Sequence, residues 1–198
     1  MKDISRTVSA VSERMDRLEL LRERSVAASR SIIRLTKRTI HAIHSGDEYR
    51  SFLNNAVSEF NSLYELIRGE PEVLFSGPAE DAMAELAEAC MLSSIVNDDE
   101  IPSYSLLNIT PQSWAMGLAD CLGEMRRILL AHLMNDRIKE AKAMFDDMEV
   151  VCGHVLSFDV PDAILPIRRK QDVARSVMER TRTDIANALL MSRADLKY

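Results

Sequence analysis

The 198-residue chain has little of what breaks helices or spans membranes. It contains six glycines, six prolines and one tryptophan, and only 5% of its residues are aromatic. No stretch approaches the roughly 20 uninterrupted apolar residues that a membrane helix needs. The first residues also lack the apolar block of a signal peptide. We therefore expect a cytoplasmic protein that does not cross a membrane.

Several kinds of chemical site are absent from the sequence. The Gly-Lys-Ser/Thr of a phosphate-binding loop never occurs, and no serine or cysteine nucleophile has a plausible histidine relay. The four histidines lack zinc-ligand spacing. The three cysteines, Cys90, Cys121 and Cys152, have no CxxC spacing and each lies in an apolar helical run. They are interpreted as reduced core residues.

Charge is unevenly distributed along the chain. The net charge is −6, which argues against a protein that binds nucleic acids without selectivity. Lysine and arginine outnumber acids by 10 to 5 in residues 1–45 and by 8 to 4 in residues 166–198, whereas residues 46–165 hold 7 bases and 22 acids. This asymmetry suits a protein that presents cations to a polyanion and carboxylates to metal ions.

Helical periodicity runs through almost the whole chain, and no segment shows sustained strand alternation. Asp47 is expected to cap one helix, and Thr110 followed by Pro111 is a strong start signal for another. The expected fold is all-α, a bundle of roughly seven helices forming a single domain over residues 1–198. The pattern places helices at about 3–44 (one helix or two), 47–68, 79–96, 110–134, 135–156 and 167–191, with a polar loop over 97–108 and a connector over 158–166.

Four acids stand in helical segments where a packed core favours apolar side chains. Glu85 and Glu88 are three residues apart, and Asp120 and Glu124 are four apart, so each pair lies on one helical face. If the two pairs meet in an apolar setting, a cation must neutralise them, and Mg²⁺ or Mn²⁺ prefers oxygen ligands of this kind. The alternative from spacing alone is that they are helix caps and surface ion pairs.

Two glycines flank Asp120 within the same helical segment. Gly117 and Gly123 lie three residues before and after it, and a helical glycine costs about 1 kcal/mol relative to alanine. They leave space around the carboxylate. Either another helix approaches closely there, or the space accommodates a metal ion and a phosphate group.

Basic residues form two candidate phosphate-binding groups. The first follows one helical face with few acids between its members, and the second begins the last helix. Either group could instead be a solvated surface. In the last helix, ion pairs such as Asp172–Arg175 are enough to explain most of the charged residues. The candidate RNA-binding residues are Arg30, Arg34, Lys37, Arg38 and His41 in the first group and Arg168, Arg169 and Lys170 in the second.

Four blocks of sequence together resemble the translin superfamily. Residues 117–127, with Asp120 and Glu124, look like its signature helix, and residues 84–89 resemble the Glu-x-x-Glu-Ala segment of the translin-associated factor X branch. Residues 158–175 are similar to archaeal members, and residues 31–41 form a fourth matching block. The resemblance extends over nearly the whole chain, and its specificity comes from the order and spacing of these short blocks.

The resemblance implies a seven-helix fold that assembles into a hollow homo-octamer holding single-stranded RNA, with single-stranded DNA as the alternative ligand. In the factor X branch the four acids form a Mg²⁺-dependent endoribonuclease site, whereas the translin branch is generally a catalytically silent binder. Glu85, Glu88, Asp120 and Glu124 are therefore expected to be both catalytic and metal-binding residues. The chain is shorter than eukaryotic members between Glu88 and Asp120, which affects only the loop over 97–108.

Other functions remain open at this point. An all-α Mg²⁺-dependent nucleoside-triphosphate pyrophosphohydrolase also pairs Glu-x-x-Glu with a second acidic helix, although its second motif has a spacing of three. A di-iron bundle is disfavoured because Glu-x-x-His is absent. A non-catalytic RNA- or single-stranded DNA-binding scaffold would retain RNA without cleaving it. If the assembly is an enclosed chamber, we expect it to accommodate duplexes poorly.

Overall fold

The computed structural model describes the backbone of residues 4–195 and the side chains as far as residue 191; the two ends of the expected domain, 1–3 and 196–198, lie outside the described residues. The described part is all-α without strands, which confirms the expected fold class. It contains no helix long and apolar enough to cross a membrane. The helices are α1 (Ile4–Ser45), α2 (Arg50–Ile67), α3 (Pro71–Leu74), α4 (Gly77–Asn97), α5 (Pro111–Met134), α6 (Ile138–Ser157) and α7 (Arg168–Asp195).

The helix boundaries agree with the sequence to within a few residues, with two differences: α2 begins without the expected cap, and the short α3 was not expected. The first segment is one uninterrupted helix, and the short α3 lies between two proline-containing breaks where no helix was expected. Thr110 caps α5 as expected, because its hydroxyl accepts a 3.0 Å hydrogen bond from the Ser113 amide. The expectation for Asp47 is wrong: α2 begins three residues later, and the Glu48 carboxylate accepts a 2.7 Å hydrogen bond from the Arg50 amide.

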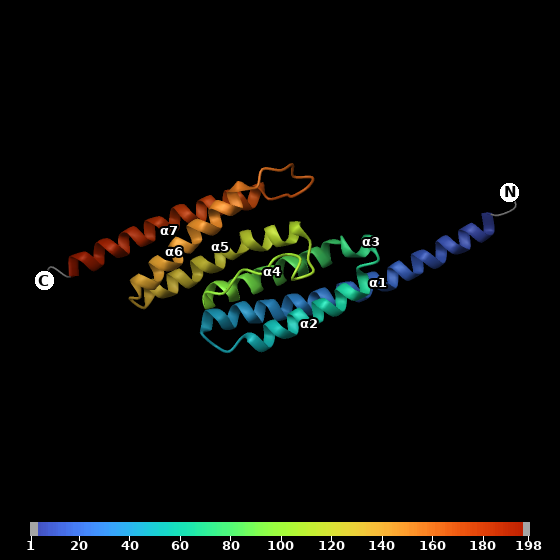
Figure 1. Ribbon diagram of the computed structural model, residues 1–198, viewed down its shortest axis with the longest axis horizontal. Coiled ribbons are helices and arrows are strands. Elements are labelled where there is room, and N and C mark those ends of the chain that lie inside the picture. The colour runs from blue at the N-terminus through green and yellow to red at the C-terminus, as the bar shows by residue number, and fades with distance from the viewer. Residues whose placement is uncertain (1–3, 196–198) are drawn as a thin grey trace.

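The helices form an elongated bundle with α4 and α5 at its centre (Figure 1). α1 packs against α2 and α4 on one side, and α5 packs against α6 and α7 on the other. The N-terminal part of α1 extends beyond the bundle, and the two termini lie at opposite ends of the molecule (Figure 1). Every segment that carries a candidate site residue therefore belongs to α1, α4, α5 or the start of α7.

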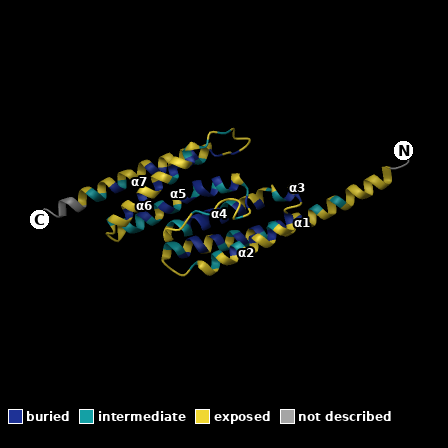
Figure 2. Ribbon diagram, viewed as in Figure 1, coloured by how far each residue is buried: buried dark blue, intermediate teal, exposed yellow. Residues whose placement is uncertain are grey.

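Aliphatic and methionine side chains from α1 to α7 make up one continuous core. Leu86 and Met91 of α4 and Leu122, Met125 and Leu129 of α5 are all but fully buried. Burial of apolar surface stabilises such a core by about 25 cal/mol per Å². The cysteines are buried and free, as the sequence predicted. The projecting turns of α1 are exposed by contrast (Figure 2).

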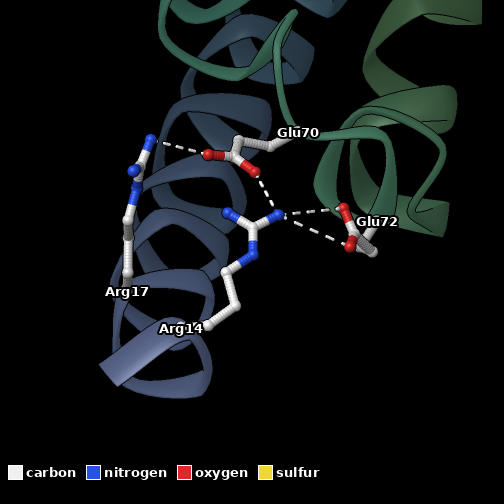
Figure 3. Close-up of polar contacts among 4 residues, drawn as sticks. All are labelled: Arg14, Arg17, Glu70 and Glu72. Atoms are coloured by element: carbon white, nitrogen blue, oxygen red, sulfur yellow. Dashed lines mark hydrogen bonds and ion pairs between the residues drawn. The ribbon is translucent and has the colours of Figure 1, made fainter. Parts of the chain in front are cut away.

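A buried glutamate holds α1 at the point where its projecting part leaves the bundle. Glu70, only 5% exposed, forms ion pairs with Arg14 and with Arg17, the latter at 2.7 Å, and Arg14 also reaches Glu72 at 3.5 Å (Figure 3). The hydrogen bond from Arg14 is the largest cause of the lowered pKa of Glu70. This clasp joins the basic start of the chain to its acidic centre.

α4 and α5 approach each other closely at Gly117. A Cβ atom added there would lie 2.6 Å from the Ala84 carbonyl oxygen and 2.9 Å from the Glu88 amide nitrogen. Gly117 therefore serves close helix packing, one of the two explanations that the sequence allowed. Gly123 is different, because an added Cβ would meet nothing within 4 Å.

Gly117→Ala should destabilise the protein by about 1–3 kcal/mol, since the new methyl group must push apart two backbones in a packed core. Gly123→Ala is the matched control: in open space on the same helix it should stabilise the protein by up to about 1 kcal/mol. Urea denaturation of both variants measures the difference. Equal effects of the two substitutions would contradict the close approach at Gly117.

Candidate metal and RNA site

The contact at Gly117 brings the two acidic pairs together. Next to it, the Cys121 thiol donates a 3.4 Å hydrogen bond to the Glu88 carbonyl oxygen, so α4 and α5 are held in register along this face. The charges of Asp120, Glu85 and Glu124 all act on the Glu88 carboxylate. The four acids therefore belong to one cluster, contributed by two helices.

The cluster opens into a cavity of about 250 Å³ between α1, α4 and α5. Three of the four acids line this cavity, and three cationic or potentially cationic side chains line it with them. Its lining residues are Lys37, Ile40, His41, Glu85, Glu88, Glu124 and Arg127. A polyanion entering the cavity would thus meet both the acids and their counter-charges.

The α4 acids are the less compensated pair. Glu88 is 9% exposed, and within the described chain its carboxylate has no hydrogen-bond or ion-pair partner. Burial, followed by the neighbouring acids, raises the pKa of Glu88 to about 8. Burial also raises the pKa of Glu85, an effect that the charge of Lys37 opposes. An added cation would relieve both penalties.

The α5 acids each contact a cationic or potentially cationic side chain of the same protein. Lys170 of α7 forms an ion pair with Asp120, and His44 of α1 forms a short hydrogen bond with Glu124. The bond to His44 is the largest cause of the lowered pKa of Glu124, and Arg127, 4.0 Å away, adds to it. With the α5 acids held in this way, no group of three or more acids, histidines or cysteines in the described chain has metal-ligating geometry.

The donor set nonetheless fits a hard divalent cation. It consists of carboxylate oxygens only, which Mg²⁺ and Mn²⁺ accept, and it includes one buried carboxylate with no partner. The side chains of Asp120 and Glu124 must turn from Lys170 and His44 towards the α4 acids to complete it.

The structure divides the first basic group. Lys37 and His41 line the acidic cavity. Arg30 and Arg34 are exposed on α1 outside it. Arg38 turns towards α2, where its guanidinium lies 4.5 Å from the centre of the Phe52 ring. Arg30, Arg34, Lys37 and His41 keep the helical spacing of one face, whereas Arg38 leaves it, because residues adjacent in sequence point about 100° apart around a helix.

The second basic group is also divided. Lys170 reaches the acidic cluster through Asp120. Arg168 forms a 3.2 Å ion pair with Asp162 of the preceding connector, and both side chains are largely exposed. Arg169 is exposed.

Sequence reasoning missed two residues of the site. Arg127 follows Glu124 by three positions, a spacing that places both on one face and could have been noticed. His44 lies 80 residues from Glu124 and carries no comparable signal. Only the packing of α1 beside the central helices brings this imidazole to the acid.

Comparison with known proteins supports the translin-like interpretation at the level of structure. No family model matches the chain. The structure resembles AfC3PO with a TM-score of 0.86 and 29% identity over 93% of this chain and 98% of that one. It also resembles AfC3PO in a solved complex with duplex RNA, with a TM-score of 0.79, 28% identity and coverage of 93% and 97%. The fold of apo-NeC3PO is similar too, with a TM-score of 0.82 and 20% identity over 91% and 96% of the two chains.

A curated relative extends this similarity in sequence. The uncharacterized protein MJ0175 of Methanocaldococcus jannaschii is 33% identical over 168 residues, which span 83% of this chain and 75% of that protein. The sequence blocks, the helical fold and the C3PO structures agree with one another, and the chain belongs to the translin superfamily, in which C3PO-like proteins share its fold.

Proposed function

We propose that the protein is a Mg²⁺- or Mn²⁺-dependent endoribonuclease that cleaves single-stranded RNA. The observation that carries this proposal is the meeting of two carboxylate pairs from α4 and α5 at a cavity that Lys37, His41 and Arg127 also line. The chain's relationship to C3PO proteins, one of which was solved with RNA, supports RNA as the ligand.

Glu85, Glu88, Asp120 and Glu124 would hold one or two cations. Such a cation acts as a Lewis acid, which activates water and offsets negative charge at phosphorus. The chain's own groups supply the remaining functions. One carboxylate of the cluster would accept the proton of the attacking water, while Glu88, whose pKa burial raises to about 8 in the absence of a cation, would be ionised when it ligates one.

Phosphate binding follows from the positive side of the cavity. Lys37, His41 and Arg127 stand beside the acids and would orient the phosphate to be cleaved. Arg30 and Arg34 lie on the exposed surface of the same helix as Lys37, where they would contact phosphates farther along the strand. The basic ends of the chain thus offset its negative total charge locally.

Assembly into a closed homo-octamer would explain the apolar surface that the single chain leaves exposed. Ile4, Val8, Val11 and Met15 follow one face of the projecting part of α1, and all are more than half exposed. A second copy of the chain would remove this surface from water. A closed shell would also direct the RNA-binding surface inward.

Replacing Glu88 with Gln or Asp120 with Asn should reduce RNA cleavage in Mg²⁺ at least about 10²-fold, because each removes an anionic ligand from the cluster that would hold the cation. Labelled single-stranded RNA is the substrate, and chelator should stop cleavage by the parent protein. Circular dichroism should show unchanged helix content.

The matched control for these variants is Glu59→Gln, an exposed acid on α2 outside the cavity, which should cleave RNA at the parental rate. Cleavage by Asp120→Asn at the parental rate would refute the site. RNA that is bound but stays intact in Mg²⁺ would identify a binding scaffold instead. Hydrolysis of nucleoside triphosphates without cleavage of RNA would identify a pyrophosphohydrolase.

Light scattering should give a mass of about eight times the 22.3 kDa chain, since a shell with closed symmetry covers the exposed α1 surface. The assembly should cleave single strands and leave duplexes intact. Because AfC3PO has been solved with duplex RNA, cleavage and not binding must be compared. Monomers or dimers that cleave RNA at full rate would rule out the enclosed chamber.

In the metal-free protein, ionisation of Glu88 should lower the free energy of unfolding as pH rises from about 4.5 to about 8. Glu88 keeps its proton in the folded state up to a pKa of about 8, whereas the unfolded chain releases it near 4.5, so ionisation favours unfolding within this window. At pH 8, Glu88→Gln should therefore have a free energy of unfolding higher than that of the parent protein by an amount on the order of a few kcal/mol. At pH 4.5 the two proteins should be equally stable.

Thermal unfolding in chelator measures this difference. Glu59→Gln serves again as the exposed control, and its stability relative to the parent protein should not change with pH. Added Mg²⁺ should stabilise the parent protein more than Glu88→Gln at pH 8, since the ionised carboxylate then has a cation. A parent protein whose stability rises from pH 5 to 8 relative to Glu88→Gln would contradict the buried, uncompensated carboxylate.

A further inference from the structure

Lys170 reaches the acidic cluster from the far side of the bundle. It lies on the first turn of α7, and its ammonium group forms an ion pair with Asp120 of α5, 50 residues away in sequence. The Lys170 side chain is 26% exposed and that of Asp120 is 41% exposed, so the pair lies at the border between the cluster and solvent. It is therefore accessible to an incoming ion.

The backbone around Lys170 is held in place independently of this ion pair. Arg126 of α5 donates hydrogen bonds of 2.7 Å to Thr181 and to Asp184 of α7. Gln171, next to Lys170, is buried and donates a 2.8 Å hydrogen bond to the Phe158 carbonyl oxygen. If the contact with Asp120 were lost, the ammonium group would stay within reach of the cluster.

The acids of the two helices differ in how they are compensated. Asp120 of α5 contacts Lys170, whereas Glu88 of α4 has no partner within the described chain. An ammonium group and a divalent cation need the same carboxylate lone pairs, and both attract them electrostatically. Asp120 cannot ligate a metal ion fully while it is the partner of Lys170.

We propose that Lys170 is an internal counter-cation of Asp120. A divalent cation displaces the Lys170 ammonium group from Asp120, and Lys170 then binds an RNA phosphate at the same site. This inference rests on the proposed function, because it assumes that Asp120 is a ligand. In the metal-free protein Lys170 reduces the repulsion between Asp120 and the α4 acids. After displacement the positive charge of Lys170 would be free to bind a phosphate beside the cluster, so metal binding and RNA binding would strengthen each other.

The first test measures Mn²⁺ binding by calorimetry in the absence of RNA. Lys170→Met should bind Mn²⁺ about threefold to fivefold more tightly than the parent protein, since a partly exposed ion pair is a weak competitor. Lys142→Met is the matched control. Lys142 forms a 2.7 Å ion pair with Asp146 within α6, outside the cavity, and its removal should leave Mn²⁺ affinity unchanged.

The second test uses RNA binding in chelator, where neither metal nor cleavage contributes. Asp120→Asn should bind single-stranded RNA more tightly than the parent protein, partly because Lys170 is released. That gain should shrink by more than half when Asp120→Asn is combined with Lys170→Met, a comparison that a double-mutant cycle isolates. Lys170→Gln replaces Lys170→Met in both tests if circular dichroism shows that the Met variant does not fold.

The outcomes separate this inference from the function on which it rests. A parent protein that binds no Mn²⁺ overturns the proposed metal site, and the displacement with it. A parent protein that binds Mn²⁺, together with a Lys170 variant of equal or weaker affinity, overturns the displacement alone. If Lys170→Met does not change the increase in RNA affinity caused by Asp120→Asn, the role of Lys170 in binding RNA is overturned.

Discussion

The close approach of α4 and α5 at Gly117 is the constraint on which the rest of the structure depends. The absence of a side chain there lets the α5 backbone lie directly against Ala84 and Glu88 of α4. This packing places the buried carboxylate of Glu88 within the electric field of Asp120 and Glu124. A larger residue at this position would separate the two acidic pairs and relax the core at the same time.

Bringing four acids together raises an electrostatic cost that the outer helices partly offset. α1 contributes Lys37 and His44, and α7 contributes Lys170. Glu88 remains without a partner in the described chain, and its pKa of about 8 reflects that residual cost. The site is thus incomplete as an electrostatic unit, which is the physical argument for an external cation.

The outer helices also connect the site to the ends of the molecule. α1 passes the acidic cavity, and the clasp of Arg14 and Arg17 on Glu70 fixes it where its projecting part begins. The turns beyond this clasp expose apolar side chains. A second copy that packs there would contact the helix that also carries Lys37, which lines the acidic cavity.

The sequence by itself determined the all-α class, the α5 start at Thr110 and the pairing of the acids within each helix. These features depend on local periodicity and capping, which residues a few positions apart decide. The family resemblance follows from the same local blocks. The start of α2 was misplaced because Glu48, rather than Asp47, accepts hydrogen bonds from the Arg50 amide and the Ser51 hydroxyl.

Only the tertiary structure decided which charges meet. Lys170 forms an ion pair with Asp120, 50 residues away in sequence, and His44 forms a hydrogen bond with Glu124, 80 residues away. Arg38 packs on the Phe52 ring instead of lying with the other basic residues. Helical periodicity shows which side chains share a face, but it contains no information about which helix packs against that face. The packing of α1 and α7 around the central pair therefore determined the compensation of the acids, because electrostatic interactions depend on distance in space rather than on separation in sequence.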